Sequence, residues 1–318
     1  ILDCLIEHRS ELPRGGNCAR EVSTALQHRG ENIKLDPTLS TACHDDQIQW
    51  CGHVDSNVPG AVQDCLSLHL ARLSPDCLAA DFEFVKMRAA DVRLNPSILH
   101  YCDREIKTVC KSVKLAGSEM VQCLEARLQQ RHNDIRKECQ DALRISQKLE
   151  SQFSVLNSRL LTACDDDILK LGCTNQNDAT SGSAVFDCLA DGQLSVENSV
   201  CRAQIVFQLG VQTNDISLDP HISKECTVDI QRFCSDLVDE GQIIGVDCLR
   251  DNIDRLNDFC FDAVFLSLRR AALTNSIVTH RALSQACSTS IRDSCRLTGA
   301  QETVLCLLQL APSLKTEQ

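Results

Sequence analysis

Twenty-one cysteines recur in this 318-residue chain with a fixed order of gaps, and this repeat constrains the fold more than any other feature. The first cysteines of successive sets lie 59, 62, 62 and 61 residues apart. The sets, including a partial one at each end, are Cys4 and Cys18; Cys43, Cys51, Cys65 and Cys77; Cys102, Cys110, Cys123 and Cys139; Cys164, Cys173, Cys188 and Cys201; Cys226, Cys234, Cys248 and Cys260; and Cys287, Cys295 and Cys306. Such periodicity is typical of a repeat protein.

The number of cysteines indicates an oxidising compartment, where disulfides persist. Zinc sites need close cysteine pairs such as C-x2-C, whereas the shortest gap here holds seven residues. We therefore predict disulfides, no metal or other cofactor, and a location in the secretory-pathway lumen or outside the cell.

Composition and capping signals predict helices. Aromatic residues make up 3% of the chain, and long stretches rich in Leu, Ala, Gln, Glu, Lys and Arg favour helix. Residues 76–91 have a helical apolar pattern, and a helix-start signal follows at Asn95-Pro96, as it does at Asp36-Pro37 and Asp219-Pro220. Asn157-Ser158 keeps the cap residue without the proline. After each signal we predict one helix that carries the first and second cysteines, followed by a shorter helix that carries the third. The predicted fold class is all-α: an elongated, α-solenoid-like array of disulfide-stapled helical repeats of about 60 residues.

Division of the chain at the helix-start signals gives four complete repeats and two partial ones. The predicted boundaries are 1–36 (partial), 37–95, 96–157, 158–219, 220–280 and 281–318 (partial).

Geometry ranks the possible disulfide pairings. Cys77 and Cys110 each lie about 14 residues from the turn between their helices, which places them at the same height on antiparallel helices. Cys102 is rotated by about 80° from Cys110 and faces Cys123. The favoured pairs are therefore Cys18–Cys51, Cys43–Cys65, Cys77–Cys110, Cys102–Cys123, Cys139–Cys173, Cys164–Cys188, Cys201–Cys234, Cys226–Cys248, Cys260–Cys295 and Cys287–Cys306. The alternative is nested pairing within one set, first with fourth and second with third.

No catalytic motif is present, so the chain is not expected to be an enzyme. The net charge of −12 argues against nucleic acid as a partner, and no run of 18 apolar residues predicts a membrane span. Acidic residues stand three positions after the first cysteine of each complete set: Asp46, Glu105, Asp167 and Asp229. They form either a ligand face for a basic partner or a solvated helix face.

The four-cysteine unit, with its C-x7-C spacing, its Cys-Leu third position and its L-[DN]-P cap, resembles the cysteine-rich repeat of the Golgi apparatus protein 1 family. That family consists of membrane-anchored glycoproteins of the secretory pathway that bind fibroblast growth factors. The resemblance implies a luminal or extracellular ectodomain that binds or sorts secreted proteins such as basic growth factors. Because the sequence contains neither an anchor nor an Asn-x-Ser/Thr sequon, an ectodomain fragment or a soluble relative without N-glycans is expected.

Two other functions are compatible with the pattern. The array could be a structural spacer or scaffold of the secretory pathway or cell surface, or a disulfide-stapled lipid-binding protein. A lipid carrier requires a contiguous apolar groove, which a regular array does not predict.

Overall fold

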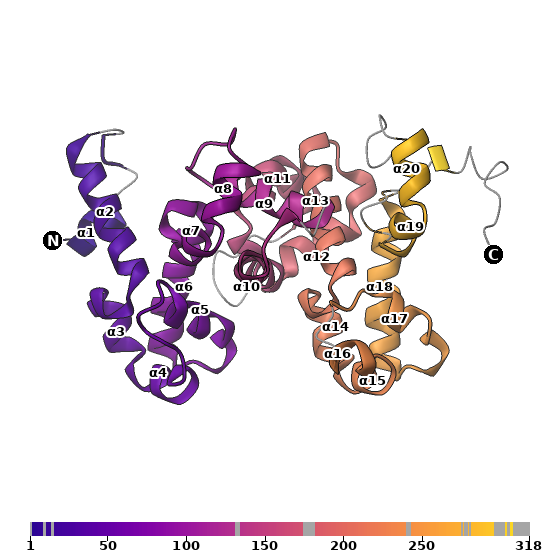
Figure 1. Cartoon of the computed structure of the whole chain (residues 1–318), viewed down its shortest axis with the longest axis horizontal. Helices are drawn as coiled ribbons and strands as arrows, with labels where there is room; N and C mark the ends of the chain where they lie inside the picture. The colour runs from indigo at the N-terminus through magenta and orange to yellow at the C-terminus, as the bar shows by residue number, and fades with distance from the viewer. Residues whose placement is uncertain are drawn as a thin grey trace. The chain divides into compact units, whose positions relative to one another are not determined.

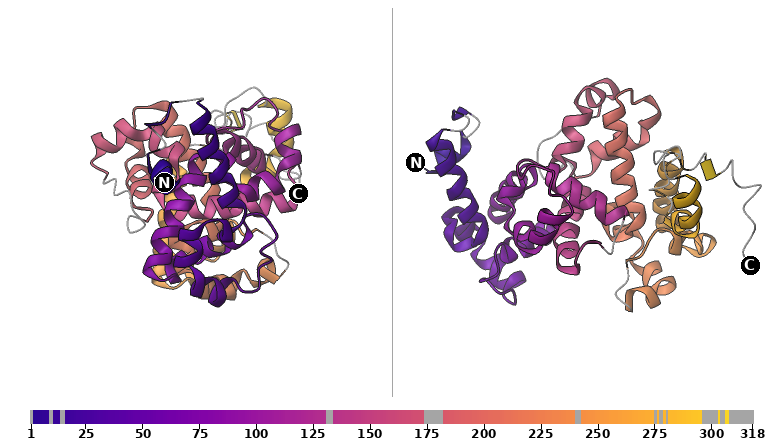
Figure 2. Two further views of the ribbon diagram at one scale, coloured as in Figure 1. Left: turned by 90° about the vertical axis from the view of Figure 1, so that its left-hand side faces the viewer. Right: turned by 45° about the horizontal axis from the view of Figure 1, so that its top comes forward.

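The structure, a computed structural model, describes residues 2–8, 11–13, 16–130, 134–173, 182–239, 243–274, 276, 279, 281–295, 303 and 306–307. It contains two compact units, Ile1–Leu149 and Glu150–Gln318 (Figure 1). Within the described ranges every regular element is a helix, and short loops connect the helices (Figure 2). The predicted all-α fold of disulfide-stapled repeats is thereby confirmed.

The longest helices of the repeats carry the fourth cysteine of each set. The helix predicted over 76–91 is observed as Pro75–Ala90. These helices are α2 (Asn17–Glu31), α6 (Pro75–Ala90), α10 (Lys137–Gln152), α13 (Ser199–Asn214) and α18 (Asp258–Leu273). We call them the fourth-cysteine helices.

A cap residue begins the next helix at the predicted signals. Asp36 accepts hydrogen bonds from the backbone N–H groups of Thr38 and Leu39, both at 3.1 Å. The side chains of Asn95, Asn157 and Asp219 make equivalent bonds to backbone N–H groups two or three residues further on. Because these bonds satisfy N–H groups that lack helical partners, they define the helix start in each repeat.

The chain around the first and second cysteines forms two short helices in most repeats, where the sequence analysis expected one. The break falls on the first cysteine; Cys43, for example, has ψ 12°. The pairs are α3 (Pro37–Ala42) and α4 (His44–Cys51), α7 (Pro96–Tyr101) and α8 (Asp103–Thr108), α14 (Pro220–Glu225) and α15 (Thr227–Phe233), and α19 (Arg281–Ala286) and α20 (Ser288–Ser294). In the third complete repeat, α11 (Ser158–Leu171) continues through Cys164.

Shorter helices carry the third cysteine, and 3-10 turns connect the parts of a repeat. The third-cysteine helices are α1 (Leu2–Glu7), α5 (Ala61–Leu68), α9 (Glu119–Gln130), α12 (Ala184–Asp191) and α17 (Asp247–Arg250). The turns are η2 (Ile33–Leu35), η3 (Leu70–Arg72), η4 (Val92–Leu94), η6 (Ser154–Leu156), η8 (Gln193–Ser195), η9 (Ile216–Leu218) and η10 (Ile253–Arg255), and one further short helix is α16 (Ser235–Asp239).

The disulfides are nested within each set, so the favoured pairing of the sequence analysis is wrong and its alternative is observed. The first cysteine bonds to the fourth with Cα–Cα distances of 4.6–4.7 Å, and the second bonds to the third at 5.7–6.2 Å. The nine bonds are Cys43–Cys77, Cys51–Cys65, Cys102–Cys139, Cys110–Cys123, Cys164–Cys201, Cys173–Cys188, Cys226–Cys260, Cys234–Cys248 and Cys295–Cys306. The free cysteines are Cys4, Cys18 and Cys287.

The expected pairs Cys18–Cys51, Cys43–Cys65, Cys77–Cys110, Cys102–Cys123, Cys139–Cys173, Cys164–Cys188, Cys201–Cys234, Cys226–Cys248, Cys260–Cys295 and Cys287–Cys306 therefore do not form. The prediction compared only the positions of two cysteines along the axes of adjacent helices. Such a comparison does not show which helix packs closely enough to supply the bonded cysteine. The first-cysteine helix packs against the fourth-cysteine helix of its own repeat: α3 against α6, and α14 against α18 (Figure 1).

The second, third and fourth complete repeats each have a hydrophobic core around their four cysteines. In the second complete repeat, for example, Ile98, Met120, Leu124 and Leu143 are at most 1% exposed. Similar clusters fill the third and fourth complete repeats. Two bridges close loops of 34–37 and 13–15 residues in each complete repeat, and loops of this size are worth about 3–4 kcal/mol each in restricted unfolded-state entropy. A unit of about 60 residues thus gains a stabilisation that its small core alone does not supply.

Candidate functional site

The acidic residues predicted as a ligand face are buried. Asp46, Glu105, Asp167 and Asp229 are 6%, 2%, 2% and 3% exposed. They lie in different repeats at equivalent positions, and they do not form an exposed stripe. Both interpretations of the sequence analysis, a ligand face and a solvated face, are therefore wrong.

Each of these acids instead accepts a hydrogen bond from the backbone at the start of the fourth-cysteine helix of its own repeat. The N–H of Ser74 donates to Asp46 at 3.2 Å, and the Ser74 hydroxyl donates to the same carboxylate at 2.6 Å. The corresponding backbone donors are Arg136 to Glu105 at 3.0 Å, Glu197 to Asp167 at 3.2 Å, and Asn257 to Asp229 at 3.0 Å. We call this set the acid latches.

The latch of the second complete repeat also carries an ion pair. Arg136 Nε donates to Glu105 Oε1 at 3.0 Å, and its Nη2 reaches Asp103 at the same distance. Burial raises the pKa of Glu105, but its hydrogen bonds with Arg136 outweigh that effect and hold the pKa below its ordinary value. Glu105 therefore remains an anion whose charge is neutralised within the repeat, and it is not available to a basic ligand.

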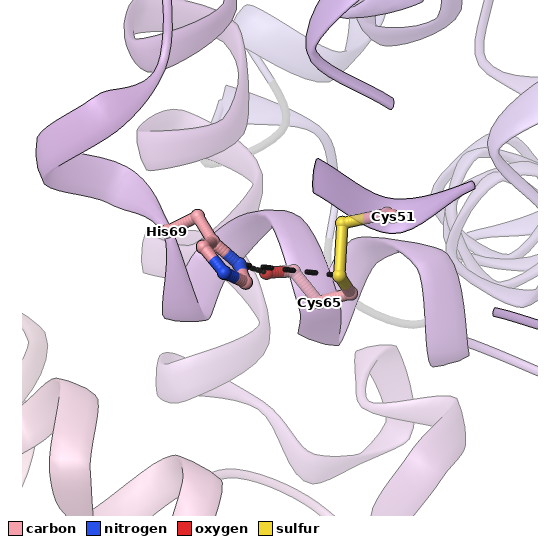
Figure 3. Close-up of side chains that lie close together, drawn as sticks. All are labelled: Cys51, Cys65 and His69. Atoms are coloured by element: carbon pink, nitrogen blue, oxygen red, sulfur yellow. Dashed lines mark hydrogen bonds between the residues drawn. A yellow bond between two sulfur atoms is a disulfide. The ribbon is translucent and has the colours of Figure 1, made fainter. Parts of the chain in front are cut away.

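Cys51, Cys65 and His69 are the described residues whose ligand atoms come together closely enough to suggest a metal site (Figure 3). The two sulfurs are bonded to each other, and His69 Nδ1 is 2.8 Å from the backbone oxygen of Cys65. Thiolates bind metals, whereas disulfide sulfurs do not. Trp50 stacks on the His69 ring at 5.7 Å, with Arg72 over the Trp50 ring. The arrangement is structural.

A charged network connects two consecutive repeats inside the second unit. The buried guanidinium of Arg270 donates to Asp187 at 2.7 Å and to both carboxylate oxygens of Asp191 at 2.9 Å. His221 Nε2 lies 3.1 Å from Asp187, and this hydrogen bond raises the pKa of His221. These contacts join α12, α14 and α18, and each of the two carboxylates is paired with the Arg270 guanidinium.

The fourth-cysteine helix α18 carries an exposed aromatic surface. Phe259, Phe261 and Phe265 are 72%, 39% and 54% exposed, and the rings of Phe261 and Phe265 stack with centroids 6.1 Å apart. Exposed Asp258 and Asp262 lie on the same helix, one turn from these rings. We call these five residues the phenylalanine face.

The sequence analysis missed the phenylalanine face, although a signal was present. Three of the nine phenylalanines fall between residues 259 and 265. In the preceding repeat the equivalent positions are Val200, Arg202 and Val206. Comparison of equivalent positions would have singled out this helix.

In the described part of the chain, no helix is long and apolar enough to cross a membrane.

Comparisons with known proteins support the resemblance found in the sequence. The profile of the cysteine rich repeat family matches residues 16–74, 75–132 and 199–257. Golgi apparatus protein 1 of Homo sapiens is 23% identical over 293 residues, which cover 86% of this chain and 24% of that protein. Its Gallus gallus counterpart is 22% identical over 93% of this chain and 26% of that protein. The Caenorhabditis elegans Golgi apparatus protein 1 homolog is 28% identical over 76% and 22%, respectively.

The chain therefore spans about a quarter of the length of these relatives. No solved structure matches it. The predicted repeat boundaries remain a prediction. Each range matched by the family profile begins just before the fourth cysteine of a set, whereas each predicted repeat begins before the first cysteine. The relatives and the nine disulfides indicate a location in the secretory pathway or outside the cell. With its matched repeats covering more than half of its length, this chain belongs to the cysteine rich repeat family.

Proposed function

We propose that this chain is a luminal or extracellular binding protein for secreted proteins, and that the phenylalanine face of α18 is its ligand contact. The observation that carries the proposal is the exposed, stacked Phe261–Phe265 pair beside Asp258 and Asp262. Aromatic anchors surrounded by a polar rim are typical of the energetic centre of protein interfaces.

The size of the phenylalanine face is suited to an anchor. A phenylalanine buries about 150–250 Å² when it is fully covered, so the exposed fractions correspond to roughly 250–400 Å². Covering that area contributes roughly 6–10 kcal/mol before the cost of association. Association itself costs about 4–15 kcal/mol, so the face needs further contacts to give tight binding.

Charge favours a basic partner. The chain has a net charge of −12, and the acids beside the aromatic rings are exposed, unlike the acid latches. Exposed charge pairs give less than about 1 kcal/mol each, but they increase the rate of encounter and select the partner. A basic growth factor, the ligand class implied by the family resemblance, has the required charge.

The test measures binding of a basic fibroblast growth factor to the oxidised chain by surface plasmon resonance. We expect the double variant Phe261→Ser, Phe265→Ser to bind about tenfold more weakly or worse, as removal of an interface anchor does. The matched control is Leu169→Ser on α11, which removes a side chain that is 76% exposed in another repeat and should leave affinity unchanged.

A second variant isolates the charges. Asp258→Asn, Asp262→Asn should slow association at low salt and weaken its dependence on salt, because it removes steering. Equal binding by the double phenylalanine variant and by the parent would overturn the proposal. So would sedimentation that shows self-association of the chain through the same two phenylalanines, which would make the face a contact between copies. Binding of neutral lipid vesicles that depends on these rings would favour the lipid-binding alternative.

A further inference from the structure

The second residue of the helix that follows the cap contacts the preceding repeat in three complete repeats. We call it the junction position. The three contacts are Ser97 to the backbone oxygen of Pro59 at 3.4 Å, Arg159 to Glu150 at 2.6 Å, and His221 to Asp187 at 3.1 Å. Of the three side chains at this position, only that of His221 gains or loses a charge near neutral pH.

His221 meets a carboxylate that other groups already hold in place. Asp187 on α12 accepts a hydrogen bond from the Ser183 hydroxyl at 2.7 Å and another from Arg270 of α18 at 2.7 Å. The Arg270 contact keeps α18 attached to α12 whether or not His221 is protonated. His221 Nε2 lies 3.1 Å from both oxygens of Asp187, so it adds a separate link between α14 and α12 that depends on its proton (Figure 1).

Among the described residues, three charged groups act on the His221 ring: Asp187 on α12, Arg270 on α18 and Asp219 on α14 itself. Neighbouring charged groups have partners of their own, namely Arg269 with Asp191, Lys224 with Glu225, and Asp215 with the Ser217 hydroxyl of η9. The Asp219 carboxylate caps α14 and accepts the backbone N–H of His221 at 3.0 Å. Burial raises the pKa of Asp219, so its titration must be distinguished from that of His221.

We propose that His221 is a proton-dependent clamp that strengthens the contact between α14 and α12 in an acidic lumen and weakens it at the neutral pH outside the cell. A charged donor makes a hydrogen bond about twice as strong as a neutral one. The hydrogen bond to Asp187 raises the pKa of His221 above its ordinary value of 6.5. The stabilisation is therefore fully present below about pH 6.5 and is lost as the pH rises through the higher folded value. The clamp does not depend on the ligand proposed for α18.

Hydrogen–deuterium exchange of the full oxidised chain tests the clamp. Mass spectrometry follows α12 and α14 at about pH 5.5 and about pH 7.5, with rates corrected for intrinsic exchange. We expect exchange in these helices of the parent to rise about two- to fivefold, the effect of a partly exposed ion pair. His221→Arg supplies a permanent cation, as Arg159 does at the junction position of the preceding repeat, and should stay at the low level at both pH values. His221→Gln has no charge and should stay at the high level.

Two control variants should behave like the parent. Asp219→Asn removes the second titrating group and keeps a cap residue, as Asn157 does at the start of α11, and His53→Gln removes an exposed histidine from another repeat. An NMR titration of the His221 ring should give a pKa above 6.5 that falls in Asp187→Asn. An ordinary His221 pKa, a rise in exchange that persists in His221→Gln, or one that disappears in Asp219→Asn would overturn the proposal.

Discussion

Removal of one acid latch should destabilise its repeat, and Asp46 offers the sharpest case. Asp46→Ala removes the acceptor for both the N–H and the hydroxyl of Ser74 at the start of α6. A hydrogen bond to a charged group contributes about 1.5–3 kcal/mol, and the loss of a helix cap costs about 0.5–2 kcal/mol. Because the two effects overlap, we expect the free energy of unfolding of this repeat to fall by about 2–4 kcal/mol.

The neighbouring residue provides the control. Asp45 is exposed, and Asp45→Ala makes the same change of charge one position earlier in α4. A surface substitution of this kind should change stability by less than about 0.5 kcal/mol. The difference between the two variants therefore measures burial and hydrogen bonding, and the change of net charge cancels.

Trp50 makes the assay local. It is the single tryptophan of the chain and lies on α4 with Asp46, so its fluorescence during urea unfolding reports on this repeat alone. A signal from the whole chain would average the unfolding of several repeats. The disulfides are kept oxidised throughout. If Asp46→Ala and Asp45→Ala unfold at the same urea concentration, the acids at this position do not latch the fourth-cysteine helix.

Three further predictions concern the core. Peptide mapping of the non-reduced chain should recover Cys43–Cys77, and recovery of Cys77–Cys110 would contradict the nested pairing. Burial raises the pKa of Asp81 from 3.8 to about 7, so between these pH values the folded carboxyl keeps a proton that the unfolded one has released. The free energy of unfolding should therefore fall as pH rises from about 4 to 7. Urea titrations repeated across this pH range should show the fall for the parent and no such dependence for Asp81→Asn. Gly60 has φ 76°, and a Cβ added there would lie 2.6 Å from the Ser97 hydroxyl oxygen. Gly60→Ala should therefore cost about 1–3 kcal/mol of stability and lower the melting temperature, and an unchanged melting temperature would refute this.

Much of the fold could be predicted from local chemistry. The caps at Asp36, Asn95, Asn157 and Asp219 were readable because a side-chain acceptor followed by Pro or a helix former satisfies backbone groups within three residues. Such signals concern neighbours in sequence, so they needed no knowledge of the tertiary arrangement.

The pairing of the cysteines and the role of the acids depended on which helices are neighbours in space, and helical periodicity does not carry that information. Helical periodicity indicates that Asp46 and its equivalents occupy the same position on the corresponding helix of each repeat. For Asp46, whether that position meets solvent or another helix depends on where α6 lies. A regularly repeated acid three residues after a cysteine is equally compatible with both outcomes, and the buried one is observed.

The contrast between shared and unshared positions indicates where function lies in such an array. Positions that recur in every complete repeat, namely the cysteines, the caps and the acid latches, are disulfide-bonded or hydrogen-bonded within their own repeat. Each of them is needed to fold a unit whose core is small, so substitution there costs stability before it changes recognition. A ligand that distinguishes one repeat from another must contact residues that differ between repeats. Phe261 and Phe265 differ from Arg202 and Val206 of the preceding repeat and are exposed, which makes α18 the place to test binding first.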